Sequence, residues 1–308
     1  MGNVLIRGTA LEKRFGDFVA VDKIDFEVYE GESFGFLGPN GAGKTSTMRM
    51  IGAVSPVTSG SLSVLGLDPM VDGPRLRSRL GVVPQENNLD EELSVYDNLL
   101  KYGRYFDLDK KTLKERIDEL LHFVQLEDKR DSKVSALSGG MKRRAIIARG
   151  LVNEPEVYIL DEPTTGLDPQ ARHVLWDRLY RLKQQGVTLI ITTHYMDEAE
   201  QLGDRLVVMD KGEIVAEGSP KELIETYTPR DVVELRFPVG VLEEITGQIE
   251  ELSDRAEILA DRALVYTDDA EKTIHLVNER RLDPEMVLAR RSTLEDVFLR
   301  LTGRTLVE

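Results

Sequence analysis

The stretch GPNGAGKT, from Gly38 to Thr45, decides the fold of the larger part of this chain. It fits the pattern G-x-x-x-x-G-K-[ST], in which a glycine-rich loop wraps closely around phosphate oxygens because no Cβ atom blocks the approach. An apolar run, Phe34 to Leu37, leads in, and a helix-like run, Gly43 to Ile51, leads out. We expect the phosphates of a nucleotide to bind Gly38, Asn40, Gly41, Ala42, Gly43, Lys44, Thr45 and Ser46.

Two residues of this loop have distinct expected roles. Lys44 would reach the β- and γ-phosphates, and the Thr45 hydroxyl would bind Mg²⁺. A second signal supports this prediction: the apolar run Val157 to Leu160 ends in Asp161 and Glu162. Open α/β sheets bind ligands at the carboxyl ends of their strands. Asp161 is therefore expected to bind Mg²⁺, and Glu162 is expected to act as the general base that activates water. Without the phosphate loop, a solvated acidic turn at the end of the strand would be the better interpretation.

A third signal is Leu137-Ser138-Gly139-Gly140-Met141, which opens a basic helix that carries Lys142, Arg143, Arg144 and Arg149. Ser-Gly-Gly at the start of a helix is another arrangement that binds anions. One nucleotide does not need two such loops, so the second loop would serve a different nucleotide. The alternative is a serine N-cap with a flexible entry to the helix, which is common for so short a string.

The order of the predicted elements indicates an α/β domain over residues 1–227. Apolar runs of buried parallel strands alternate with helical patterns, and strand, helix, strand over 157–192 implies a right-handed βαβ crossover. The predicted strands are Leu5–Lys13, Ile24–Tyr29, Ser33–Leu37, Leu80–Val83, Val157–Leu160, Thr188–Thr192, Leu206–Met209 and Ile214–Ala216. The predicted helices are Gly43–Ile51, Val95–Phe106, Leu113–Val124 and Gln170–Gln184.

A second unit, over residues 228–308, is predicted as a small α+β domain after a linker at Thr228-Pro229. Its role stays open between regulation, dimerisation, contact with a membrane subunit and a packing appendage. A predicted strand, Val232–Phe237, is followed by a helix, Leu242–Leu252. A hairpin around Asp261-Arg262 then joins Ala256–Leu259 to Ala263–Tyr266. The next elements are a helix, Glu271–Arg281, a strand, Met286–Ala289, and a helix, Leu294–Leu301.

Composition excludes several classes of protein. The formal net charge of −15 argues against a nucleic-acid partner, which favours a basic stripe. The absence of cysteine excludes disulfides and thiolate metal sites. No apolar run approaches the roughly 18 residues of a membrane-spanning helix, and no signal peptide opens the chain. We therefore expect any membrane role to come through a partner.

Together these motifs resemble those of the ABC-family ATPases, along the whole of residues 1–218. Gly38 to Thr45 resembles the Walker A motif, Val157 to Glu162 the Walker B motif, and Leu137 to Met141 the LSGGQ signature, with Met141 where the family usually has Gln. Four further residues match in positions that the family leads one to expect. Phe15 resembles the aromatic residue that stacks on adenine, and Gln85 resembles the Q-loop glutamine. Asp168 resembles the D-loop aspartate, and His194 resembles the switch histidine.

The resemblance implies a RecA-like core with an antiparallel β subdomain and a helical subdomain. It also implies ATP and Mg²⁺ as ligands, with Gln85 near the metal, and a head-to-tail homodimer in which Ser138, Gly139 and Gly140 of one copy close on the nucleotide of the other. His194 would hold the γ-phosphate and water in line, Asp168 would belong to the nucleotide-binding residues, and Gln85 would link the Mg²⁺ site to a transmembrane partner.

The strings Ser138 to Arg144, Leu294 to Phe298 and Leu301 to Arg304 resemble a subgroup of drug-resistance (daunorubicin-type) and nodulation-type exporter ATPases. This resemblance implies separate ABC-2-type membrane subunits and a cytoplasmic protein on the inner face of the cell membrane. Two alternatives remain: an ABC ATPase that acts on nucleic acid or ribosomes, and a sensor that binds ATP without hydrolysing it. The acidic charge argues against the first, and intact Lys44, Asp161, Glu162 and His194 argue against the second.

Overall fold

The computed structural model describes residues 2–238 and 240–303, and Arg304 of the subgroup string lies outside them. The chain divides into two compact units, Met1–Glu217 and Gly218–Glu308. This division comes earlier than the expected boundary after Tyr227. No helix of the described residues is long and apolar enough to cross a membrane.

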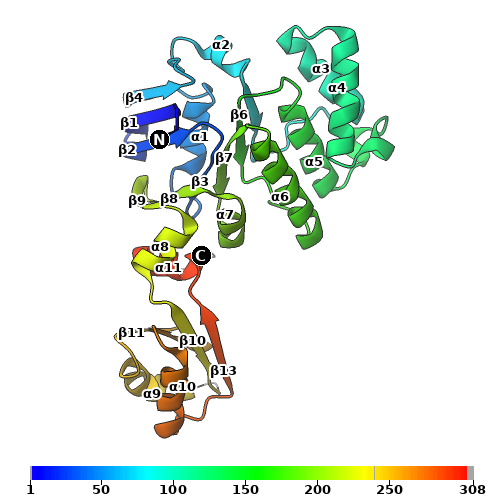
Figure 1. Cartoon of the computed structure of the whole chain (residues 1–308). Helices are drawn as coiled ribbons and strands as arrows, with labels where there is room; N and C mark the ends of the chain where they lie inside the picture. The colour runs from blue at the N-terminus through cyan, green and yellow to red at the C-terminus, as the bar shows by residue number, and fades with distance from the viewer. Residues whose placement is uncertain (1, 239, 304–308) are drawn as a thin grey trace. The chain divides into compact units, whose positions relative to one another are not determined.

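The first unit is built on a six-stranded sheet with the order β5-β6-β7-β3-β8-β9, shown in Figure 1. The pairs from β5 to β8 are parallel, and all residues of β3, β6 and β7 are buried, as expected where both faces of a sheet are covered. The strands are β3 (Ser33–Leu37), β5 (Leu80–Val83), β6 (Val157–Asp161), β7 (Thr188–Thr193), β8 (Arg205–Asp210) and β9 (Glu213–Gly218).

An antiparallel sheet with the order β2-β1-β4 packs against this core. The ring of Phe26 in β2 meets the ring of Phe36 in β3 edge-on at 5.3 Å. Strand β4 was not predicted, because only Leu62 and Val64 of its six residues are buried and serine and glycine fill the rest. The strands are β1 (Val4–Phe15), β2 (Phe18–Tyr29) and β4 (Ser59–Val64).

Helices α3, α4 and α5 pack around a core that includes Leu99, Ile117 and Ile146 and continues to Tyr158 of β6 and Leu189 of β7, and Figure 1 shows these helices beside α6. The predicted helix Val95–Phe106 is shorter, since α3 ends at Gly103 and a 3-10 turn, Arg104–Phe106, follows. The α-helices of this unit are α1 (Lys44–Ile51), α2 (Gly73–Arg77), α3 (Val95–Gly103), α4 (Lys110–Phe123), α5 (Gly139–Gly150), α6 (Pro169–Gln184) and α7 (Met196–Leu202). Further 3-10 turns are Glu127–Lys129 and Val134–Ala136.

The second unit is an α+β domain, as predicted. Its antiparallel sheet has the order β11-β12-β10-β13, and α9 and α10 cover a core around Val233, Leu235 and Val265. Helix α8 was not predicted, although Ser219 and Glu222 form a capping box before it. The elements are α8 (Pro220–Tyr227), β10 (Asp231–Arg236), α9 (Val241–Glu250), β11 (Arg255–Ile258), β12 (Arg262–Thr267), α10 (Ala270–Glu279), β13 (Met286–Arg291) and α11 (Leu294–Thr302).

Candidate functional site

The phosphate loop joins β3 to α1, and its glycines are required by its geometry. Gly41 and Gly43 have φ angles of 83° and 104°, which non-glycine residues rarely adopt. A Cβ atom on Gly38 would lie 2.3 Å from the main-chain oxygen of Met209. Helix α1 begins after Gly43 without a side-chain cap, so the N–H groups of its first turn can receive an anion.

The Lys44 ammonium lies within this loop and is 4% exposed. It donates to the main-chain oxygens of Gly38 and Pro39 at 2.7 and 3.0 Å, and its Nζ lies 4.0 Å from Oε1 of Glu162. Burial lowers the pKa of Lys44, and the carboxylates of Glu162 and Asp161 oppose that shift. The positive charge is thus held where the loop would place phosphate oxygens.

Asp161 ends β6 beside the loop, and three oxygen-bearing side chains meet there. The Thr45 hydroxyl donates to Asp161 Oδ1 at 3.2 Å, and the Thr192 hydroxyl donates to the same oxygen. Burial raises the pKa of Asp161, while these hydrogen bonds lower it. Hydroxyl and carboxylate oxygens are the ligands that Mg²⁺ prefers, and this ion usually keeps waters and substrate phosphates as its other ligands. Accordingly, no group of three or more His, Cys, Asp or Glu side chains among the described residues could hold a metal by itself.

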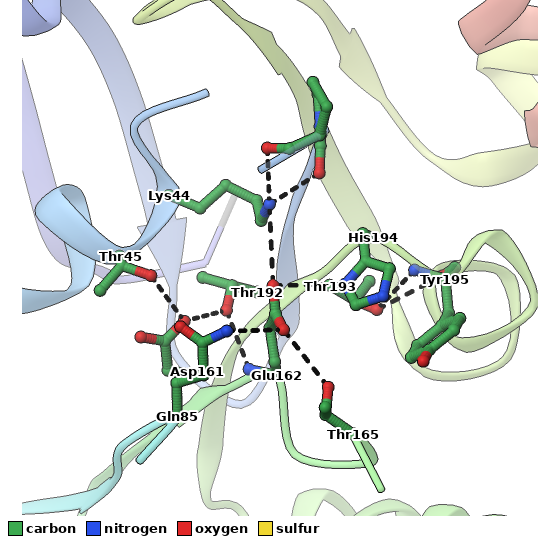
Figure 2. Close-up of polar contacts among 12 residues, drawn as sticks. Lys44, Thr45, Gln85, Asp161, Glu162, Thr165, Thr192, Thr193, His194 and Tyr195 are labelled. Carbon is green, nitrogen blue, oxygen red and sulfur yellow. Dashed lines mark hydrogen bonds and ion pairs between the residues drawn. The ribbon is translucent and has the colours of Figure 1, made fainter. Parts of the chain in front are cut away.

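Glu162 is the centre of the polar network that Figure 2 shows. Its carboxylate accepts hydrogen bonds from Gln85 Nε2 at 3.0 Å and from the Thr165 hydroxyl at 3.3 Å. Its Oε1 lies 3.2 Å from Nδ1 of His194, without the alignment of a hydrogen bond. The residue has a φ of 49°, a strained conformation of the kind that clusters at functional sites. The structure therefore brings together Lys44, Gln85, Glu162 and His194.

An open pocket of about 330 Å³ borders the phosphate loop, and it is lined by Phe15, Phe18, Ala20, Asn40, Gly41, Ala42, Gly43, Lys44, Thr45, Ser46, Gln85 and Glu162. Phe15 ends β1, Phe18 begins β2, and the two pair across the hairpin. They are 54% and 64% exposed. Both rings border the pocket, so Phe18, which the sequence analysis did not name, is a second candidate for stacking on a base, and its signal was its place in the same hairpin.

The second anion loop lies apart from this pocket. Among the described residues, the lining of the pocket does not include Ser138, Gly139 or Gly140. The Ser138 hydroxyl caps α5 by accepting from the N–H of Met141 at 3.3 Å, and a Cβ atom on Gly139 would meet nothing within 4 Å. Asp168 likewise caps α6, accepting from the N–H of Ala171 at 2.9 Å. Ser138 and Gly139 at the start of α5 and Asp168 before α6 are exposed, so both helix N-termini are accessible to a further partner.

Arg143 of α5 was not predicted as a site residue, yet it ties this helix to the two segments that carry Gln85, Asp161 and Glu162. Its buried guanidinium donates to the main-chain oxygens of Pro163 at 2.9 Å and of Asp161 and Glu162 at 2.7 Å each. It also donates to Pro84 O at 2.5 Å and, at 3.4 Å, to Gln85 O. One side chain thus fixes the main chain that carries Gln85, Asp161 and Glu162.

Replacing Arg143 with alanine is expected to lower kcat roughly 10- to 100-fold, because misplacing reactive groups by about 1 Å has effects of that size. The KM for ATP should change little, since the phosphate loop is untouched. Arg143→Lys keeps the charge but has too few donors for these carbonyls, so an intermediate loss is expected. Steady-state ATP turnover measures both constants.

The matched control is Arg144→Ala, because Arg144 lies on the same helix and donates to the main-chain oxygens of Val124 and Gln125 instead. The positioning role would be contradicted if the two alanine variants lost similar factors in kcat. It would also be contradicted if the lower kcat of Arg143→Ala were explained by a lower melting temperature.

Comparisons with known proteins agree on one family. The family model for ABC transporters matches residues 21–165, and the model of the nodulation factor export protein NodI, C-terminal domain, matches residues 243–303. A Nod factor export ATP-binding protein I from Burkholderia pseudomallei (strain 1710b) is 46% identical over 299 residues, with 97% of each chain covered. One from Rhizobium sp. (strain N33) is 45% identical over 305 residues, with 99% of each covered.

Solved structures of ABC transporter proteins also resemble this chain. The structure of cbiO1 from Clostridium perfringens, part of the ABC transporter complex cbiONQ, has a TM-score of 0.66 at 30% identity and covers 72% of this chain and 91% of its own. A dimeric post-hydrolysis structure of the ATP-binding cassette MJ0796, bound to ADP and Pi, has a TM-score of 0.65 at 26% identity, with 70% of this chain and 98% of its own covered.

Proposed function

The chain belongs to the family of ABC transporter ATP-binding proteins, and on that premise we propose that it drives an exporter whose membrane-spanning part is carried by separate subunits. As a member of the family it is an ATPase that binds ATP and works with transmembrane subunits. The observation that carries the ATPase part of this proposal is the single network that joins Lys44, Gln85 and Glu162 beside the phosphate loop. The direction of transport follows the relatives, whose names refer to Nod factor export.

Each side chain of the network has a place in hydrolysis. Lys44 and the N–H groups of the phosphate loop bind the β- and γ-phosphates. Glu162 accepts the proton of the attacking water, and His194, 3.2 Å from that carboxylate, orients the water and the γ-phosphate. Thr45, Asp161 and Gln85 would hold Mg²⁺, which supplies positive charge to the phosphates when bound. Phe15 stacks on the adenine, and Phe18 lies close enough to share that contact.

The second anion loop supports a head-to-tail homodimer. Ser138, Gly139 and Gly140 do not border the pocket of their own chain, whereas α5 begins with an open N-terminus that favours negative charge. In the proposed dimer this N-terminus closes on the γ-phosphate that Lys44 of the other copy holds. Arg143 then connects the two sites, because it links α5 to the main chain of Glu162.

A groove beside Gln85 suits the membrane partner. It has a volume of about 420 Å³, and its lining includes Arg49, Val54, Tyr102, Gln85 and Asp161. A segment seated there would touch both the Q-loop glutamine and the residue expected at the metal. We propose that this segment belongs to an ABC-2-type membrane subunit, as in the subgroup that the chain resembles, and that the protein works at the inner face of the cell membrane.

The proposal is tested by purifying the tagged chain from detergent-solubilised membranes of its own host. The expected result is recovery of a multi-span membrane protein in stoichiometric amount, together with ATP turnover that this partner stimulates. A charge variant in the groove, Arg49→Glu, should lose the partner while the isolated chain still hydrolyses ATP. Recovery of ribosomes or nucleic acid in place of a membrane protein would overturn the proposal and favour the alternative role.

A further inference from the structure

Glu198 is a buried carboxylic acid of the first unit that lies outside the polar network around Glu162. It belongs to α7 and is 0% exposed, although glutamate is almost never fully buried unless it is paired. Nε1 of Trp176 in α6 donates to Oε1 of Glu198 at 3.4 Å. Oε2 has no aligned hydrogen-bond partner among the described residues. Leaving a buried polar atom unpaired costs stability, so this carboxyl calls for an explanation.

A second buried polar atom without an aligned partner lies next to this carboxyl. Oγ1 of Thr164 is buried and has no aligned hydrogen bond in the described part of the chain. Burial raises the pKa of Glu198, and the hydroxyls of Thr193 and Thr164 beside the carboxyl oppose that shift. The uncharged carboxyl carries one O–H donor as well as acceptor oxygens. It can therefore accept from Trp176 through Oε1 and donate to Thr164 through Oε2.

Thr164 lies on the segment that follows Glu162, the proposed general base. The N–H and the hydroxyl of Thr165 both donate to Glu162, to its main-chain oxygen and to its carboxylate, at 3.3 Å each. The segment therefore turns tightly around Glu162, which itself has a φ of 49°. A group that holds Thr164 consequently holds the main chain from which the Glu162 carboxylate projects.

Thr193 lies on the other segment, directly before His194. It ends β7, and its hydroxyl accepts from the N–H of Tyr195 at 2.9 Å, which fixes the turn that carries His194. Nδ1 of His194 lies 3.2 Å from Oε1 of Glu162 (Figure 2). The carboxyl of Glu198 thus meets both of the segments whose separation sets the distance between Glu162 and His194.

We propose that Glu198 is a positioning residue for ATP hydrolysis, which joins the segment after Glu162 to the segment of His194 and so directs both side chains at one water. The inference rests on the proposed function, in which Glu162 and His194 act together. Glu198 acts only through these segments, because in the described chain it is not among the residues that line the pocket beside the phosphate loop. Trp176 anchors the carboxyl to a third element, α6.

Glu198→Leu tests this role in the full-length protein, because leucine fills most of the same space without a polar atom. We expect kcat to fall roughly 10- to 100-fold, the effect of misplacing reactive groups by about 1 Å. The KM for ATP should change little, since the phosphate loop is untouched. The melting temperature should also change little, because leucine replaces a carboxyl that is only partly hydrogen-bonded in the core. Steady-state ATP turnover and a thermal melt measure these quantities.

A conservative variant and a matched control distinguish positioning from packing. The amide of Glu198→Gln reproduces the acceptor and the donor of an uncharged carboxyl, so this variant should retain most of the wild-type kcat. The control is Asp197→Ala, because Asp197 is the preceding residue and also contacts α6, through Arg172 at 3.3 Å. Its side chain is exposed, and exposed ion pairs contribute little, so kcat should stay near the wild-type value.

Thr164→Val removes the hydroxyl but keeps the shape of the side chain, so it tests the bridge itself. It should lower kcat several-fold with little change in KM. If Glu198 acts through Thr164, the double variant Glu198→Leu/Thr164→Val should lose less kcat than the product of the two single losses, because the effects of residues in contact are not independent.

Wild-type kcat in Glu198→Leu or Thr164→Val, an equal loss in Glu198→Gln or Asp197→Ala, or strictly multiplicative losses in the double variant would rule the proposal out. All of these assays use the basal turnover of the chain without a membrane subunit. Failure to recover such a subunit would therefore count against the proposed function and would leave these results unaffected.

Discussion

Replacing Lys44 with alanine is expected to lower ATP turnover by about 100-fold or more, the usual effect of removing one preorganised group that stabilises transition-state charge. Among the described residues, Lys44 is the only lysine that lines the pocket beside the phosphate loop, and its ammonium is buried and donates to the main-chain oxygens of Gly38 and Pro39. Turnover at saturating ATP with Mg²⁺, together with equilibrium binding of a fluorescent ATP analogue, separates the loss of chemistry from the loss of affinity.

The control for this experiment is Lys101→Ala. Lys101 is a surface residue 3.3 Å from Asp90, and exposed ion pairs of this kind contribute little to stability. The two variants should melt at similar temperatures if Lys44 is a site residue rather than a structural one. Wild-type turnover in Lys44→Ala would show that the phosphate loop has been assigned wrongly.

Gly139→Asp is expected to leave ATP binding intact but to lower turnover by a similar factor, about 100-fold. A side chain at Gly139 would meet nothing within 4 Å in its own chain, so the fold accepts the substitution. In the proposed dimer the new carboxylate faces the γ-phosphate bound by the other copy, and like charges repel strongly in a partly dry site. Gly139→Ala adds a methyl group without charge and should lose much less activity.

A mixture of the two inactive proteins extends this test. A heterodimer of Lys44→Ala and Gly139→Asp has one doubly damaged site and one site with an intact phosphate loop and an intact signature. Turnover above the sum of the separate proteins is therefore expected. Loss of ATP binding by Gly139→Asp alone would instead place Ser138 to Gly140 at the nucleotide of their own chain.

Much of the fold and of the candidate site could be predicted because the decisive signals are local in the sequence. The phosphate loop carries its glycines, lysine and threonine within eight consecutive positions, and the buried strands β3, β6 and β7 are continuous apolar or threonine-rich runs. The hairpin of the second unit was also visible, because Asp261 and Arg262 interrupt two apolar runs.

The residues that the sequence did not reveal depend on contacts between distant segments. Thr192 reaches Asp161 only because β6 and β7 are neighbours in that register. Arg143 was visible as one of several basic residues on a helix. Nothing in the sequence indicates that its guanidinium donates hydrogen bonds to the main-chain oxygens of Asp161 and Glu162.

The most direct test of the ATP-driven dimer is the sedimentation of Glu162→Gln with ATP and Mg²⁺. The amide keeps the shape of the carboxylate but cannot accept a proton from water, so ATP should remain bound and hold two copies together. We expect a dimer in ATP, a monomer in ADP, and no measurable turnover. The same sedimentation coefficient in both nucleotides, with turnover near that of the wild type, would contradict it.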